Sequence, residues 1–197
     1  YKEQKLVLEF EGIATKAEIY VNGTLLKRNY SAYVPFTVDI TDMVHFGKNP
    51  NTIAVYVDAT RWEGWWYEGA GIFGNVWLHV VPQIHFAPYG IYVETTEMEQ
   101  GNFGTDIPAV YSSGESRWKL KTSTTLENET EESRELKISY RLCKGEKETA
   151  AWDEKVLLNS WGNVKIESET ELINPLLWDV EHPELYQMEV RLLTAEG

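Results

Sequence analysis

The residues best suited to chemistry gather in one segment, residues 58–75, which reads DATRWEGWWYEGAGIFGN. It contains three tryptophans, one tyrosine, two glutamates, one aspartate and one arginine among four glycines, which favour a loop. Aromatic faces stack against the C–H faces of sugar rings, whereas carboxylates and guanidinium groups form hydrogen bonds with sugar hydroxyls. The composition therefore predicts a carbohydrate site on a loop.

Four side chains of this segment are the candidate substrate contacts: Asp58, Trp65, Trp66 and Glu68. Asp58 directly follows an alternating apolar run, so we expect its carboxylate at the end of a strand. An aspartate in this position can equally be a turn former that hydrogen-bonds to nearby backbone. The aromatic residues can equally anchor the loop on its own domain or on another one, because large aromatics dominate interfaces as readily as ligand sites.

The chain carries no pattern that predicts catalytic, metal or cofactor chemistry of its own. Glu63 and Glu68 lie close in sequence, but an acidic chain contains many such pairs, so they do not establish the carboxyl pair of a retaining glycosidase. Cys143 is the only cysteine, and no metal-ligand spacing links the four histidines. Glycines 69, 71 and 74 precede a predicted strand, whereas a dinucleotide motif opens a helix. We predict no catalytic residue, no metal and no cofactor.

The charge of the chain argues against two classes of partner. Among 197 residues there are 31 acidic and 18 basic ones, a formal net charge of -13, and no basic cluster interrupts this background. Nucleic-acid binding depends on clustered cations that neutralise phosphates. The longest apolar stretch, residues 76–81, contains His79 and is too short to span a bilayer. We therefore expect neither a nucleic-acid partner nor a membrane.

The elements that must position the aromatic segment are predicted to be strands. Apolar and polar residues alternate, as in strands with one buried face, in residues 6–10, 17–21, 34–40 and 53–57. Asn22-Gly23 joins two of these runs, and this dipeptide is typical of a type I′ hairpin turn. Residues 47–51, GKNPN, predict a second turn. Residues 1–81 are therefore expected to form a first all-β module.

After Pro82 the same pattern continues in what we predict to be a second module, residues 82–197. The alternation recurs in residues 91–93, 118–122, 136–142, 164–172 and 188–192. About seven short strands over about 100 residues are typical of an immunoglobulin-like sandwich. Residues 127–135 contain five glutamates and predict a solvated loop or strand end.

Short motifs follow one another along the chain: LEFEG at 8–12, AEIYVNG at 17–23, FTVDITD at 36–42, TIAVYV at 52–57, WYEGAGIF at 66–73, PLLW at 175–178 and HPELY at 182–186. In this order they resemble the non-catalytic β-domains of glycoside hydrolase family 2, the family of β-galactosidases, β-glucuronidases and β-mannosidases. The resemblance implies an all-β fold of two consecutive β-sandwiches. The first is a galactose-binding-like jelly roll at 1–81 that lacks its first strands, and the second is an immunoglobulin-like domain at 82–197.

The resemblance also implies a function for the chain as the non-catalytic N-terminal part of a retaining exo-glycosidase, β-galactosidase-like and inactive alone. The family's nucleophile and acid/base glutamates lie on a catalytic barrel, so the implied partners are that barrel and a terminal β-linked sugar. An unpaired sheet edge can pair with another copy of the chain, so a homo-oligomer is an open alternative. A family loop supplies an acidic residue to the sugar, and Asp58 and Glu68 are the matching candidates. Gly74 stands where the family often has arginine. Asn128-Glu129 mimics the family's acid/base dipeptide, but its β-module context makes it a coincidence.

Two other interpretations stay open. The chain can be a freestanding carbohydrate-binding or adhesion protein without an enzyme attached. Alternatively, the first module is purely structural and its aromatic loop packs against the barrel. Trp65 and Glu68 distinguish the last interpretation from a substrate role, because only the latter predicts an effect of these side chains on turnover or affinity.

Overall fold

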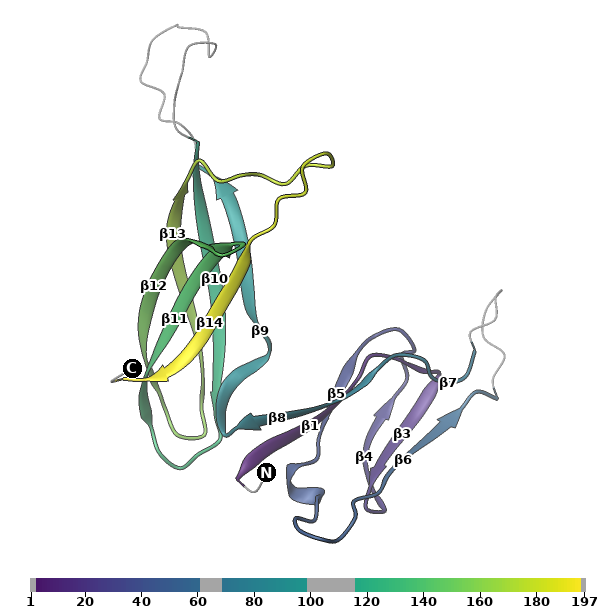
Figure 1. Cartoon of the computed structure of the whole chain (residues 1–197). Helices are drawn as coiled ribbons and strands as arrows, with labels where there is room; N and C mark the ends of the chain where they lie inside the picture. Colours follow the sequence, from purple (N-terminus) through teal and green to yellow (C-terminus); the bar gives the residue numbers. More distant parts are fainter. Residues whose placement is uncertain (1–2, 61–68, 99–115, 196–197) are drawn as a thin grey trace, which may run out of the picture. The chain divides into compact units, whose positions relative to one another are not determined.

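The computed structural model describes residues 3–60, 69–98 and 116–195 of a chain that divides into two compact units, Tyr1–Gln83 and Ile84–Gly197. The all-β prediction is confirmed: the described part consists of strands and turns with one short 3-10 helix, η1 (Thr41–Met43), and no α-helix (Figure 1). No helix in these residues has the length and hydropathy of a membrane span.

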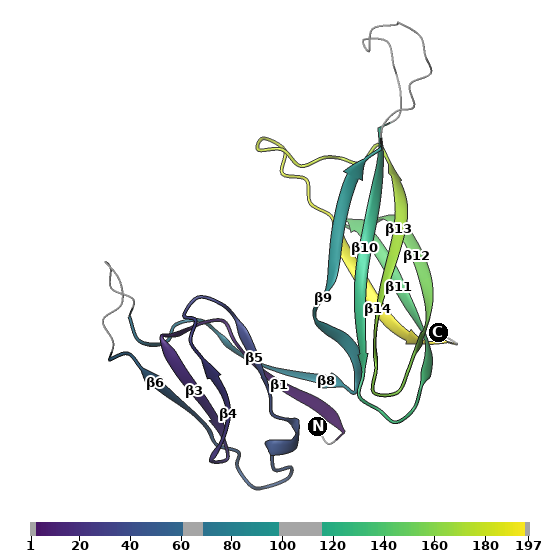
Figure 2. The same ribbon diagram turned by 180° about the vertical axis from the view of Figure 1, so that it is seen from behind.

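The first unit is a β-sandwich. Its strands are β1 (Gln4–Phe10), β2 (Ile13–Ala14), β3 (Lys16–Val21), β4 (Thr24–Asn29), β5 (Phe36–Asp39), β6 (Ile53–Asp58), β7 (Gly71–Ile72) and β8 (Val76–Pro82). They form two antiparallel three-stranded sheets with the orders β5-β1-β8 and β4-β3-β6 (Figure 2). A short antiparallel ladder joins β2 and β7. Leu8 and Phe10 of β1 share one core with Ile19 and Val21 of β3, so the two sheets bury a common interior.

The predicted hairpin turn at Asn22-Gly23 is confirmed. The two residues have φ values of 50° and 85°, and Val21 pairs with Thr24 across the turn. Positive φ at both central residues is the requirement of a type I′ turn. The Asn22 side chain also donates to the Met43 carbonyl oxygen at 2.7 Å and accepts from the Thr52 N–H at 2.9 Å, so the same residue anchors the segment that precedes β6.

The strand predicted over residues 34–40 is shorter than expected. β5 begins at Phe36, where it pairs with Phe10 of β1, and Val34 is exposed. Pro35 has no N–H to donate to a β-ladder. The alternating pattern therefore extends further than the pairing, and the first apolar residue of the run stays in solvent.

The second unit is also a sandwich. Its strands are β9 (Ile84–Glu97), β10 (Arg117–Asn128), β11 (Arg134–Lys144), β12 (Lys147–Leu158), β13 (Asn163–Ile173) and β14 (Gln187–Thr194). The sheet orders are β13-β10-β9 and β12-β11-β14. Tyr140 of β11 is fully buried between them, with its ring stacked on Trp152 at 5.0 Å and its hydroxyl donating to Thr124 Oγ1 at 2.8 Å. This contact links β11 and β12 in one sheet to β10 in the other.

The strand count differs from the expectation of about seven short strands. The described residues of the second unit form six strands, the longest of which, β9, has 14 residues. The alternation that begins again at Ile91 is the second half of this bent strand. The prediction for residues 127–135 is confirmed, because β10 ends at Asn128, β11 begins at Arg134 and the intervening glutamates at 131 and 132 are exposed.

Candidate functional site

Only part of the predicted carbohydrate loop can be placed. Trp65, Trp66 and Glu68 lie outside the described residues, as does Glu63. Asp58 is described, and so is the returning end of the segment from residue 69 onward. The site is therefore built from the two ends of the loop and from the strands that hold them.

Both ends of the loop are fixed to one short stretch of chain. Asp58, the last residue of β6, lies opposite Lys16 at the start of β3. At the other end, Gly71 lies opposite Ala14 in the β2-β7 ladder. Lys16 and Ala14 are two positions apart, so the strand pairing brings the start and the return of the loop to the same edge of the sandwich.

Asp58 forms a turn at the start of the loop. Its Oδ1 accepts hydrogen bonds from the Thr60 N–H at 3.0 Å and from the Thr60 hydroxyl at 2.6 Å. This arrangement is an Asx turn, in which the carboxylate replaces a backbone acceptor. The described contacts of Asp58 are therefore those of a turn former. Its carboxylate helps to set the direction in which the chain leaves β6.

Glu11 holds the other end of the loop, a role that sequence reasoning missed. Its Oε2 accepts from the Asn75 N–H and from the Asn75 side-chain amide, both at 2.9 Å, while its Oε1 accepts from the Trp77 indole N–H at 2.8 Å. The backbone N–H of Glu11 also donates to the Asn75 carbonyl oxygen at 3.1 Å. One carboxylate thus fixes the chain where it enters β8.

These contacts favour the charged form of Glu11. The hydrogen bond from Trp77 and the backbone hydrogen bond from Asn75 hold the pKa of the Glu11 carboxyl below its usual value of 4.5. A carboxylate that accepts several hydrogen bonds is stabilised relative to the neutral acid. Glu11 is therefore ionised at neutral pH and places a negative charge beside the returning end of the loop.

Two exposed aromatic rings flank this end of the loop. The rings of Phe73 and Tyr33 lie 5.6 Å apart, and their side chains are 58% and 65% exposed. Phe73 also covers Gly12, because a Cβ at that position would lie 2.4 Å from the tip of the Phe73 ring. Tyr33 carried no signal in the sequence pattern, since its approach to Phe73 depends on the fold alone.

The backbone at Gly74 lies too close to residues 11–12 for a side chain. A Cβ at Gly74 would lie 2.7 Å from the Cβ of Glu11 and 3.0 Å from the backbone nitrogen of Gly12. Distances below 3.0 Å force a shift, and backbone atoms do not move easily. The close approach of residues 11–12 to Gly74 therefore leaves no room for a larger residue in this conformation.

Asn128, the first residue of the Asn128-Glu129 pair, holds loops of the second unit together. The buried Asn128 amide donates to the Glu132 carbonyl oxygen at 2.8 Å and to the Asn159 carbonyl oxygen at 2.9 Å, and its Oδ1 accepts from the Thr130 N–H at 2.9 Å. These bonds close the loop between β10 and β11. The side-chain amide of Asn128 already donates to loop carbonyl oxygens. This agrees with the interpretation that the likeness of the dipeptide to an acid/base pair is a coincidence.

Strand pairing also brings together a group that spacing along the chain does not reveal. Within the described residues, His85, Glu127 and Glu129 place one ligand atom each within 4.8 Å of one another, and His85 Nε2 lies 3.3 Å from Glu127 Oε2. His85 is opposite Glu127 in the β9-β10 ladder. His85 is buried and the two carboxylates are partly exposed, and we assign this group no metal.

Comparison with known proteins places both units in one family. The family described as "Glycosyl hydrolase 2 galactose-binding domain-like" matches residues 1–68, and the family described as "Glycosyl hydrolases family 2" matches residues 106–197. The chain is 28% identical over 191 residues to a β-galactosidase, BoGH2A, of Bacteroides ovatus, covering 96% of this chain and 21% of that protein. It is 28% identical over 202 residues to a β-glucuronidase of Formosa agariphila, covering 95% of this chain and 20% of that protein.

A solved structure agrees with these matches. A glycosyl hydrolase family 2 member from Bacteroides cellulosilyticus superimposes with a TM-score of 0.85 at 26% identity, covering 100% of this chain and 25% of that one. The chain thus spans about a fifth to a quarter of the length of these relatives. The chain belongs to glycosyl hydrolase family 2, and its fold is that of the family's galactose-binding-like and immunoglobulin-like β-sandwich domains.

Proposed function

We propose that this chain is the non-catalytic N-terminal part of a retaining exo-glycosidase that removes terminal β-linked sugars and is β-galactosidase-like. The observation that carries the proposal is the match of both family domains, in order, in one chain whose relatives include β-galactosidases and a β-glucuronidase. Residues 1–81 then act as the sugar-binding domain and residues 82–197 as the immunoglobulin-like domain, a division close to the boundary between the two units at Gln83.

In this proposal the chemistry takes place on a catalytic barrel in the same parent protein. One barrel glutamate attacks the anomeric carbon and another protonates the leaving oxygen, and water then releases the sugar from the covalent intermediate. The present chain supplies no reacting group. It contributes a loop that reaches the bound sugar, with Trp65 and Trp66 as stacking surfaces and Asp58 and Glu68 as hydrogen-bond acceptors.

Anchoring of the loop supports this positioning role. The Asp58 turn, the pairing of Gly71 with Ala14 and the Glu11 hydrogen bonds hold both ends of the loop at one edge of the first unit. A fixed loop can hold a sugar ring in a reactive orientation, and a misplacement of about 1 Å can cost about 100-fold in rate. The exposed Phe73 and Tyr33 rings supply aromatic surface at the returning end of the loop.

The proposal is tested in the complete parent protein with a panel of p-nitrophenyl β-glycosides. We expect hydrolysis of the β-galactoside, and a fall of kcat/KM of about tenfold or more in Trp65→Ala and Glu68→Ala, because contacts realised in the transition state are lost. Trp161→Ala is the control, since Trp161 is an exposed tryptophan in the second unit.

The outcomes separate the three interpretations. Unchanged kcat and KM in Trp65→Ala and Glu68→Ala, together with a lower melting temperature, would assign the loop a purely structural role. Sugar binding by the isolated chain, combined with a parent protein that hydrolyses none of the glycosides, would support a freestanding binding or adhesion protein instead. The isolated chain itself is expected to release no p-nitrophenol.

A further inference from the structure

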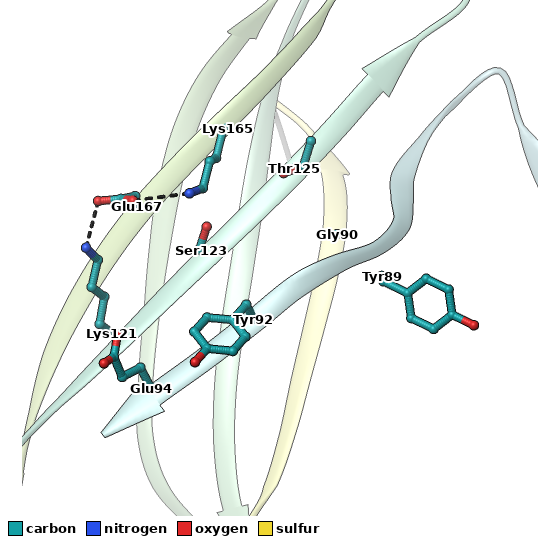
Figure 3. A pocket seen from close by; sticks show the side chains of 9 residues that line it. All are labelled: Tyr89, Gly90, Tyr92, Glu94, Lys121, Ser123, Thr125, Lys165 and Glu167. Carbon is teal, nitrogen blue, oxygen red and sulfur yellow. Dashed lines mark ion pairs between the residues drawn. The ribbon is translucent and has the colours of Figure 1, made fainter. Parts of the chain in front are cut away.

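The second unit carries a polar hollow on the sheet formed by β9, β10 and β13. Its volume is about 380 Å³, within the roughly 300–1,000 Å³ typical of small-ligand pockets. Side chains from all three strands line it, and Figure 3 shows Lys121 and Lys165 both directed toward Glu167, with Ser123 on the middle strand, β10. None of these residues takes part in the loop site of the first unit, so the hollow is a separate feature of the chain.

A bulge in β9 produces the hollow. The β9-β10 register shifts between Thr124 and Leu126 of β10, and opposite this shift Tyr89 adopts a φ of 53°. A Cβ at Gly90 would lie 2.7 Å from the Ala87 carbonyl oxygen and 2.9 Å from the Thr125 carbonyl oxygen, so only glycine allows the strands to approach here. A bulge bends the strand and increases its twist. We attribute the hollow on the outer face to this bend, because Tyr89, Gly90 and Thr125 at the bulge belong to its lining.

The polar side of the hollow contains paired charges. Glu167 Oε2 lies 2.8 Å from the Lys121 ammonium, and Glu167 Oε1 lies 3.4 Å from the Lys165 ammonium. The hydrogen bond between Lys121 and Glu167 raises the pKa of Lys121 and lowers that of Glu167, so both stay charged near neutral pH. Glu94, opposite Lys121 in the ladder, balances the second lysine. The hollow thus offers several donors and acceptors with no net charge.

The aromatic side of the hollow is Tyr92. Its ring is 64% exposed, and Tyr92 lies opposite Ser123 in the β9-β10 ladder. Figure 3 shows Tyr92 on the same side of the sheet as Glu94 and Lys121, whereas Tyr89 is directed away from this group. An exposed aromatic ring next to a balanced set of charged and hydroxyl groups favours a ligand that has both an apolar face and many hydroxyls.

We propose that this hollow binds a neutral oligosaccharide, with one pyranose ring stacked on Tyr92 and its hydroxyls bonded to Lys121, Ser123 and Glu167. The paired charges argue against an anionic ligand, because a phosphate or uronate would have to displace Glu167 from both lysines. An apolar ligand would leave the charged groups without water and without new partners. A sugar, in contrast, has hydroxyl groups that can take the place of the water molecules bound to these charged groups.

The test uses the 197-residue chain and isothermal titration with three neutral probes, a β-linked galactotetraose, cellotetraose and maltotetraose, and one charged probe, tetragalacturonate. We expect one of the neutral probes to bind and Tyr92→Ala to weaken that binding at least about tenfold, since the stacking surface is removed. Tyr92→Phe retains the ring and should bind within about twofold of the unchanged chain. Lys121→Ser should also weaken binding, since a donor is lost.

Two control variants keep the result interpretable. Tyr56→Ala removes a tyrosine of similar exposure, 59%, from β6 of the first unit and should leave binding unchanged. Trp65→Ala tests the loop of the first unit, so binding that is lost in Trp65→Ala and retained in Tyr92→Ala would overturn the inference while supporting the proposed loop. The inference would also be overturned if none of the three neutral probes bound, or if tetragalacturonate bound more strongly than all of them. Near-UV circular dichroism establishes that each variant is folded.

Discussion

At the scale of single residues, the first unit depends on carboxylates that fasten chain segments together. Asp58 closes the turn after β6, and Glu11 joins the end of the loop to the start of β8 through Asn75 and Trp77. Hydrogen bonds to an ionised acceptor are stronger than those between neutral groups. The loop site therefore rests on one carboxylate at the start of the aromatic segment, Asp58, and on a second one far from it in sequence, Glu11.

The charge of Glu11 leads to a prediction about pH. Because the pKa of Glu11 is lowered in the folded chain, its contribution to stability is complete above the unfolded value of 4.5 and is lost as pH falls through the folded pKa. Glu11→Gln should reduce the free energy of unfolding at pH 7, since an amide cannot accept from Trp77 and Asn75 on both sides. Urea titrations between pH 7 and pH 3 measure the difference.

The difference between Glu11→Gln and the unchanged chain should shrink toward zero at the acidic end of this range. Glu146→Gln, in the exposed turn between β11 and β12, is the control and should behave as the unchanged chain at every pH. A constant difference across the range would mean that the Glu11 effect comes from packing rather than from its charge.

At the scale of elements, glycines decide where two strands of the first unit can approach. Gly12 lies after the end of β1, and Gly74 lies before the start of β8. Each glycine has a neighbouring atom that is too close for a Cβ. The neighbours differ in kind. At Gly12 the obstacle is the exposed Phe73 ring, whereas at Gly74 it is the chain of Glu11 and Gly12 itself.

This difference predicts an order of stability for two alanine variants. Gly74→Ala should cost about 1–3 kcal/mol, because relief of the clash requires a backbone shift. Gly12→Ala should cost less, since the exposed Phe73 ring can rotate away, and the double variant Gly12→Ala with Phe73→Ala should recover most of that loss. Thermal unfolding of the unchanged chain, the two alanine variants and the double variant checks the order. A larger loss in Gly12→Ala than in Gly74→Ala would contradict it.

At the scale of the whole molecule, the chain contains two units with separate interiors. Ile19 is fully buried in the core of the first unit and Ile138 is fully buried in the core of the second. Separate cores are the condition for domains that unfold as independent cooperative transitions. The two sandwiches are therefore expected to respond separately to damage in their interiors.

Calorimetry can detect this independence. Ile19→Ala and Ile138→Ala each remove comparable buried volume and should destabilise their own unit by about 2–5 kcal/mol. We expect two transitions in the scan, with each variant lowering the midpoint of only one of them. A single transition that both variants shift equally would show that the two units unfold as one.

Local sequence alone indicated many of the strands of this protein and the hairpin turn at Asn22-Gly23, whereas it gave no prediction for β4 and β12. Apolar alternation reports which side chains face a sheet interior, since the side-chain period of a strand is two residues, and Asn22-Gly23 specifies its turn through its own backbone preferences. Both the alternation and the turn preference are properties of residues that are neighbours in the sequence. For the same reason the pattern at residues 34–40 extended beyond β5, because alternation does not report whether a strand partner is present.

The tertiary structure alone decided which distant residues meet. Glu11 contacts Trp77 across 66 positions, and Lys121 meets Glu167 only because β10 and β13 are neighbours in one sheet. The hollow beside Tyr92 depends on a register shift that no local pattern encodes. Strand order and register are set by the packing of a whole interior, so the residues that hold the loop and those that line the hollow emerge only once the sandwiches have formed.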